Sequence, residues 1–501
     1  MLLALAVATL AVLLGLLLGL APTASRRALG PLRTLALTAV IAVVALHLLP
    51  EALAELGVIG LLVFAAGLAL PRWLGWFSRQ GSAHAEGDRL GLELGFWGLL
   101  VHHVGDGLAL GAYARVDPRS GHSHADVLFA LVLHTVPLVA VVAAGYARTA
   151  GPRAAISRCA QLGLASVVGV FATRLVPEAA VSGAQAWIAA GVSGLLLHGL
   201  THDLGRDLPT DASGRAFDLG MALVGAGLGW LGAALDAHGG AVSAPVGEHL
   251  SAAIQRSALP LAVGLFLGAL LASRSEGGLE RYTRAASAGK GGVFSPEAFL
   301  VTLLHFGFPF ALARDLLGAL LLPLRWQASD SDTDPVAEPR SALTRLMSEL
   351  DARVDGVAAW GLLGALVAAI IRAAVPDGAL LGPAWLSVLG ALAFSVSVPL
   401  HAVAAPQLAF ALLEKGLDGS GALLIAVLAP LALRPFSVRA ALLMGVASLV
   451  CLVLAQHLPK QLLTVEPRLA LCAAALLFVL VLRRAYQRGF RGFLQPLVHG
   501  D

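Results

Sequence analysis

The chain has 501 residues, of which 58% are hydrophobic and only 13% are charged. Its mean hydropathy of +0.82 excludes the soluble globular classes and makes the lipid bilayer the expected solvent. The formal net charge of +3 is small, and it is accounted for by basic loops on one side of a membrane. The composition therefore gives no reason to expect a nucleic-acid partner.

Long apolar runs begin at the N-terminus with residues 2–20, 35–53 and 58–70. A helix needs about 20 residues to cross about 30 Å of hydrocarbon, and about fifteen runs along the chain approach this length. The runs are rich in alanine, leucine and glycine, which allow helices to pack closely in lipid. The sequence predicts an all-α, polytopic integral membrane protein of about fifteen transmembrane helices.

Basic residues predict the orientation of these helices. The first run lacks a preceding basic segment, so we expect it to be retained as a helix and not removed as a signal peptide. Arg26, Arg27 and Arg33 follow it, which places that loop in the cytoplasm and the N-terminus outside. An odd number of spans then puts the basic tail, which contains Arg483 and Arg484, in the cytoplasm as well. The expected location is the plasma (inner) membrane.

Two polar stretches divide the chain. Residues 236–255 separate eight expected spans from the rest, so we predict domains at 1–240 and 245–501. Residues 326–355 form a second polar segment, which is expected to be a loop of the second domain. This domain also contains a weak internal repeat. The repeat pairs Lys290, Gly291, Ser295, Leu303, Arg314 and Leu317 with Lys415, Gly416, Ser420, Leu428, Arg439 and Leu442.

Ionisable side chains within the expected spans are the strongest indication of function. Each costs several kcal/mol in lipid unless it faces a partner, a metal ion or water. In the first domain they occur in four spans, and several stand four residues apart on one helical face. These residues are His47 and Glu51; His102, His103 and Asp106; His134; and His198, His202 and Asp203.

The chemistry of these groups favours a transition metal. Imidazole with carboxylate suits Zn, Fe, Mn, Co or Ni better than Ca or Mg. The three cysteines are far apart in apolar runs, so no thiolate cluster is expected. A lone membrane histidine is more often a hydrogen-bonded packing residue, but four clusters in one domain favour a path for a metal ion. Mixed ligands of this kind can release an ion, as transport requires.

The fourth-span segment His102-His103-Val104-Gly105-Asp106-Gly107-Leu108-Ala109-Leu110-Gly111 resembles the signature of the ZIP metal transporters, His-Asn-x-x-Asp/Glu-Gly-Leu-Ala-x-Gly. Further resemblances lie at His47-Leu48-Leu49-Pro50-Glu51 in the second span, at His134-Thr135-Val136-Pro137-Leu138 in the fifth, and between residues 189 and 203 in the seventh. The resemblance covers about residues 1 to 240, which is the full eight-span length of that family.

The resemblance implies a binuclear metal site between the fourth and fifth spans, formed by His102, His103, Asp106 and His134. Leu138 stands where the family supplies a second ligand from the fifth span, so one ion is expected where relatives bind two. The resemblance further implies that His47 with Glu51, and His202 with Asp203, form stations along the path.

The second domain has a fainter resemblance to predicted permeases marked by Cys-Ser-Cys-Gly-x-x-Pro and a following Lys-Gly turn. Here the segment 399–406 lacks both cysteines, and His401 is the metal-capable residue near that position. Thiol-based chemistry therefore does not transfer. Three roles are open for this domain: a second transport unit, a partner for export, or a scaffold. His305 and His457 could join a path, although packing is the simpler interpretation of both.

Two other classes of function remain open from the sequence. An intramembrane zinc hydrolase could use His102, Asp106, His134, His198 and His202 to hold Zn²⁺ and a water. A membrane sensor or scaffold would bind the metal without transporting it. No phosphate-binding Gly-x-x-x-x-Gly-Lys-Ser/Thr segment is present, so ATP is not implied. We predict a transporter and not an enzyme, with no prosthetic group, Zn²⁺ as the first candidate cargo, and the bilayer and the ion as partners. A homodimer is a possible assembly.

Overall fold

The computed structural model describes residues 2–20, 26–78, 84–113, 125–172, 186–191, 193–194, 197, 208–209, 211–235, 240–274, 295–321, 341–398, 400–431, 445–453 and 466–497. Within these ranges all regular secondary structure is helical, which confirms the all-α class. The chain divides into two compact units. Unit 1 comprises Met1–Val246 with Tyr486–Gly492, and unit 2 comprises Gly247–Ala485 with Phe493–Asp501.

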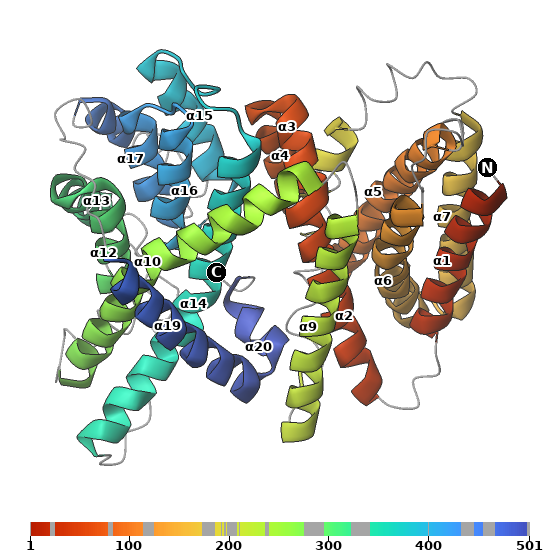
Figure 1. Cartoon of the computed structure of the whole chain (residues 1–501), viewed down its shortest axis with the longest axis horizontal. Helices are drawn as coiled ribbons and strands as arrows, with labels where there is room; N and C mark the ends of the chain where they lie inside the picture. Colours follow the sequence, from red (N-terminus) through yellow and green to blue (C-terminus); the bar gives the residue numbers. More distant parts are fainter. Residues whose placement is uncertain are drawn as a thin grey trace. The chain divides into compact units, whose positions relative to one another are not determined.

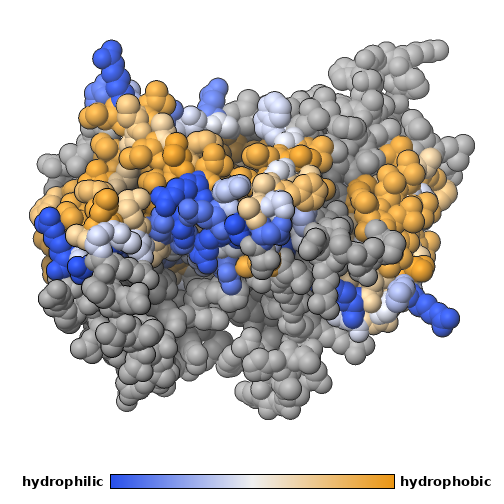
Figure 2. All heavy atoms as spheres, turned by 90° about the horizontal axis from the view of Figure 1, so that it is seen from below, coloured by the Kyte–Doolittle hydropathy of each residue, from blue (hydrophilic) through white to orange (hydrophobic). Residues whose placement is uncertain are grey.

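Five helical stretches among the described residues are long and apolar enough to cross a membrane. They are Leu37–Leu56, Pro152–Ala172, Val246–Arg274, Ala342–Ala374 and Pro467–Arg488. Large apolar side chains are also exposed on several helices, among them Leu17, Trp230, Phe266 and Phe478. Figure 2 shows one face on which hydrophobic side chains gather over wide areas around a group of hydrophilic ones. These features fit a membrane location, while the number of about fifteen spans stays a prediction.

Unit 1 is a bundle of helices with pairwise packing along the chain's first half (Figure 1). Its described helices include α1 (Leu2–Leu20), α2 (Arg26–Val43), α3 (Leu49–Leu56), α4 (Val58–Ser78), α5 (His84–Tyr113), α6 (Ala125–Thr149), α7 (Pro152–Ala172) and α9 (Ala212–Leu235). Helix α2 packs on α9, α5 on α7, and α1 on α6, and α6 also contacts α7. These apolar helices therefore bury part of their surfaces against one another inside this bundle.

Helix α2 continues into α3 through a π-helical turn, Val44–Leu48. The next residues include Pro50, which has no backbone N–H to donate into the preceding turn and so favours a change of hydrogen-bond register there. His47 lies within this turn. Single π-turns inside α-helices occur frequently at functional sites. The backbone at His47 is therefore irregular at a position that the sequence singles out for its chemistry.

Unit 2 contains helices too short to cross a bilayer alone. Its helices are α10 (Gly240–Arg274, whose first residues belong to unit 1), α12 (Pro296–Phe306), α13 (Phe308–Leu321), α14 (Ala342–Ala374), α15 (Ala384–Ser397), α16 (Ala404–Glu414), α17 (Gly419–Leu428), α19 (Pro467–Arg488) and α20 (Phe490–Leu494). Helices of 10 or 11 residues, such as α12, α16 and α17, extend about 16 Å, half the hydrocarbon thickness. They are almost wholly buried, and α16 packs against α12, α14 and α17.

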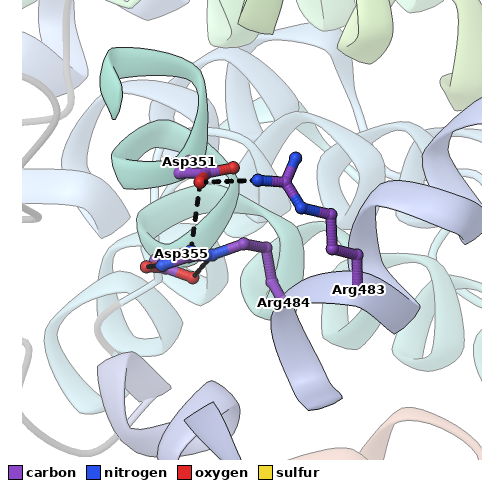
Figure 3. A network of polar contacts seen from close by, with 4 residues as sticks. All are labelled: Asp351, Asp355, Arg483 and Arg484. Carbon is purple, nitrogen blue, oxygen red and sulfur yellow. Dashed lines mark hydrogen bonds and ion pairs between the residues drawn. The ribbon is translucent and has the colours of Figure 1, made fainter. Parts of the chain in front are cut away.

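Helix α14 corrects the prediction that residues 326–355 form a loop. Residues 342 to 355 are the first part of this 33-residue helix, and residues 322–340 lie outside the described ranges. Ser341 caps the helix by accepting the N–H of Thr344 at 3.2 Å. Figure 3 shows the polar contacts of this part of α14 with α19, in which Arg483 and Arg484 reach Asp351 and Asp355. The acidic residues are therefore paired along a helix, and this pairing compensates for their low hydropathy.

The structure bears on the predicted domains and repeat in three ways. The division between units falls at Val246 and Gly247, inside α10, so residues 240–255 of the expected linker are helical. Residues 486–492, expected in the second domain, group with unit 1. In the repeat, Ser295 caps α12, whereas the matching Ser420 follows the capping residue Asp418 of α17. The repeat positions 290, 291, 439 and 442 lie outside the described residues.

Candidate metal site

Helix α5 carries the central histidines of the predicted site. His102 and His103 are 4% and 2% exposed, respectively, and both lie in a helix of 30 residues. Their rings are neighbours, with centroids 6.2 Å apart and planes at 68°. A helix can bury two consecutive histidines only where neighbouring helices offer them partners, because unsatisfied imidazole nitrogens are costly in an apolar interior.

The pair of His102 and Asp106 has the geometry that the sequence predicts. Nε2 of His102 lies 3.5 Å from Oδ2 of Asp106, one helical turn later. Two ligands of one tetrahedral Zn²⁺, each about 2.05 Å from the ion, would be about 3.3 Å apart. The two side chains could therefore bind one ion together with little movement. Their separation also permits the simpler ion pair of a protonated imidazole with a carboxylate.

His103 is oriented by a residue that the sequence analysis missed. Its Nδ1 lies 3.0 Å from Oγ of Ser166 on α7, and Ser166 is itself buried. Hydrogen bonding at one ring nitrogen fixes which way the other nitrogen, Nε2, is presented. No spacing signal could have found Ser166, because 63 residues separate it from His103 and only the packing of α7 on α5 brings them together.

Two glycines make this helix pairing close. A Cβ atom at Gly107 would lie 2.1 Å from the carbonyl oxygen of Ser166, and one at Gly169 would lie 2.2 Å from that of Val104. Backbones approach this closely only where side chains are missing on both helices. The Gly-Leu-Ala-x-Gly part of the sequence signature thus contributes Gly107 to the contact that places Ser166 beside His103.

Of the remaining predicted ligands, only Glu51 has a described side chain. His134 is in α6 and His47 is in the π-helical turn, but their side chains are not among those described. Glu51 is half-buried in the first turn of α3. Leu138 is buried in α6. His198, His202 and Asp203 lie outside the described residues.

Within the described side chains, no group of three or more His, Cys, Asp or Glu residues is close enough to hold one metal ion. The structure thus brings His102 and Asp106 within reach of one ion, and it places the Ser166 hydroxyl within hydrogen-bonding distance of His103. Two buried hydroxyls of unit 1, Thr135 and Ser193, have no hydrogen-bond partner in the described part of the chain. Thr135 directly follows His134 in α6.

Several ionisable residues of unit 2 are explained by pairing. Arg314 donates from Nη1 to Asp315 at 2.7 Å and from Nε to the carbonyl oxygen of Ala426 at 3.3 Å. Nδ1 of His305 is 2.8 Å from the carbonyl oxygen of Val301, which matches the packing interpretation. Cys159 and Cys451 are buried free thiols, and Cys472 is an exposed one.

Arg353 and Glu297 form a fully buried ion pair, with Nη1 and Oε1 2.7 Å apart. Gly268 of α10 leaves room for it, because a Cβ there would lie 2.2 Å from the Arg353 guanidinium. A pair buried to this degree is costly to desolvate and is held by its surroundings.

Comparisons of the chain with models of protein families, with curated proteins and with solved structures found no match.

Proposed function

We propose that unit 1 carries a divalent transition metal ion across the membrane, with Zn²⁺ as the first candidate. The observation that carries the proposal is the buried pair of His102 and Asp106, whose ligand atoms are 3.5 Å apart. This separation suits two neighbouring ligands of one ion. Imidazole with carboxylate, and no thiolate nearby, favours Zn, Fe, Mn or Co over Ca and Cu(I).

The surroundings of this pair support movement of the ion. Helices α5 and α7 meet through the smooth backbone surfaces at Gly107 and Gly169, beside the hydrogen bond of His103 with Ser166. The π-helical turn that contains His47 is a further position in unit 1 where backbone irregularity coincides with a predicted ligand. The proposal includes the finer topology expected from the sequence: about fifteen spans in the inner membrane, the N-terminus outside and the C-terminus in the cytoplasm.

The test is metal flux into proteoliposomes containing the full chain, measured separately for Zn²⁺, Fe²⁺, Mn²⁺ and Co²⁺. The double variant His102→Ala, Asp106→Ala is expected to lose the flux of the transported ion. The matched control is Glu248→Ala, His249→Ala, which also removes one carboxylate and one imidazole but from α10, where Glu248 is exposed and His249 is half-buried. We expect the control to transport at the wild-type rate.

Two results would contradict transport. Folded wild-type protein that binds Zn²⁺ but shows no flux would leave a sensor or scaffold. Zn²⁺-dependent release of fatty acid from a lipid amide, lost in the same double variant and without flux, would indicate the membrane hydrolase. Equal loss of flux in the control variant would show that the assay follows general damage and not the site.

A further inference from the structure

Unit 2 contains two chain interruptions that lie side by side in its interior. Helix α15 ends at Ser397, and the chain turns before α16 begins at Ala404. Nearby, α17 ends at Leu428 and the chain changes to a short 3-10 helix, Ala429–Leu431. The backbone N–H of Leu400 donates to the carbonyl oxygen of Ala429 at 3.1 Å, which joins the two interruptions. Non-helical backbone within a membrane protein is tolerated where it is buried in protein or lines a cavity, and broken helices often form ligand sites.

His401 stands in the interruption before α16 and is 8% exposed. Its ring is stacked near Trp360 of α14, with centroids 6.1 Å apart and planes at 20°. Its Nδ1 accepts the backbone N–H of Val403 at 3.3 Å. A nitrogen that accepts carries no hydrogen, so the neutral ring has its hydrogen on Nε2. That atom is buried and has no hydrogen-bond partner in the part of the chain that the structure describes. His401 thus presents an unused donor.

The charges around this donor are positive. Arg314 of α13 is fully buried, and its guanidinium interacts electrostatically with His401. The N-terminus of α16, the positive end of its dipole, begins three residues after His401. Asp315 lies beside Arg314 and partly offsets it. A cation near Nε2 would be repelled by the N–H hydrogen, by Arg314 and by the positive end of α16. An anion there would accept a hydrogen bond from the N–H and would be stabilised by the two positive groups.

We propose that the interruption between α15 and α16 is a binding site for a small inorganic anion, which accepts a hydrogen bond from Nε2 of His401. The site lies wholly within unit 2. It does not rest on metal transport by unit 1, and it gives the second unit a ligand chemistry of its own.

The test is binding of chloride, nitrate, sulfate and phosphate to the purified full chain in gluconate buffer, measured by calorimetry and tryptophan fluorescence. We expect one of these anions to bind to the wild type. His401→Leu removes the donor and is expected to weaken binding roughly ten- to a hundredfold, the loss typical of one hydrogen bond to a charged group. In His401→Gln the amide nitrogen can take the place of Nε2, so binding should stay within about threefold of the wild type.

The control is His305→Leu, which removes another fully buried imidazole from unit 2 without touching His401. It should leave anion affinity unchanged. Because His401→Leu could fail to fold, Trp360→Phe provides a second measurement: the anion should still bind by calorimetry, while the fluorescence change is reduced or lost.

Three outcomes would overturn the proposal. The first is that none of the four anions binds to folded wild type. The second is that an anion binds equally well to His401→Leu. The third is that Zn²⁺ binds to the wild type and this binding is lost in both His401→Leu and His401→Gln but kept in His102→Ala, Asp106→Ala. That pattern would make His401 a metal ligand.

Discussion

At the scale of single residues, the hydrogen bond between His103 and Ser166 connects the packing of α5 and α7 to the orientation of an imidazole. The bond holds Nδ1 and leaves Nε2 on the far side of the ring. Partners of this kind commonly tune metal ligands, and their removal typically costs about ten- to a hundredfold in metal affinity. Ser166 therefore belongs to the proposed site although it would bind no ion itself.

Replacing this serine provides the first prediction. Ser166→Ala should weaken Zn²⁺ binding about tenfold and lower the free energy of unfolding by about 1 kcal/mol, because His103 loses one hydrogen bond. Zn²⁺ titration and thermal unfolding of the full chain measure the two effects. Ser157→Ala in the same helix is the control, since Ser157 is exposed. If Ser166→Ala bound Zn²⁺ as tightly as the wild type, His103 would not take part in metal binding.

At the scale of helices, unit 1 depends on places where two backbones touch. Gly107 and Gly169 allow this between α5 and α7, and Gly225 allows it between α9 and α2, where a Cβ would lie 2.1 Å from the Thr38 hydroxyl oxygen. In lipid there is no hydrophobic driving force between helices, so close van der Waals packing of this kind has to hold them. Small residues at such crossings are therefore hard to replace.

Two glycines of α5 give a matched test of this argument. Gly107→Ala should destabilise the protein by about 1 to 3 kcal/mol, because its Cβ would overlap the Ser166 carbonyl and force the helices apart. A Cβ at Gly105 meets its nearest neighbour at 3.9 Å, so Gly105→Ala should be neutral or stabilise by up to about 1 kcal/mol through helix propensity. Thermal unfolding should show a loss of stability in Gly107→Ala and none in Gly105→Ala, and equal losses in both would refute the close crossing.

Helical periodicity made part of the candidate site predictable from the sequence. The spacing of His102 and Asp106 places them on one helical face, and the structure has them 3.5 Å apart. The contact of His103 with Ser166 was not predictable, because it depends on which helices become neighbours. Residues 342–355 read as a loop because their acids lower the hydropathy, yet Asp351 and Asp355 are paired with arginines of α19. Pairing across helices leaves no local pattern in one sequence.

At the scale of the whole molecule, the last helices return to the first unit. Asp218 of α9 is fully buried and accepts from the Thr34 hydroxyl and from Arg491, whose Nε lies 3.5 Å from Oδ1. Arg491 is buried as well, and its backbone N–H lies 3.4 Å from Oδ2. Residues 486–492 therefore complete a polar core that residues 1–246 cannot complete alone. From the sequence, the basic residues of this segment predict only its location in the cytoplasm.

Loss of this arginine should be costly. Arg491→Leu leaves the buried Asp218 carboxylate without its cation, and breaking such a pair costs about 3 to 5 kcal/mol. Denaturant unfolding of the full chain should show this loss, while Arg468→Leu, at an exposed position of α19, should unfold like the wild type. Adding Asp218→Asn to Arg491→Leu should restore part of the stability because no buried charge remains. If Arg491→Leu were as stable as the wild type, water would have to reach the Asp218 carboxylate.

The contact between Asp218 and Arg491 also sets the order in which the protein can mature. The two residues are 273 positions apart, and ribosomes add about 5 to 20 residues per second. Asp218 therefore emerges some 14 to 55 seconds before its partner is made. Throughout that interval the nascent first unit carries a carboxylate without its native cation, and it reaches its final form only after residue 491 has been made.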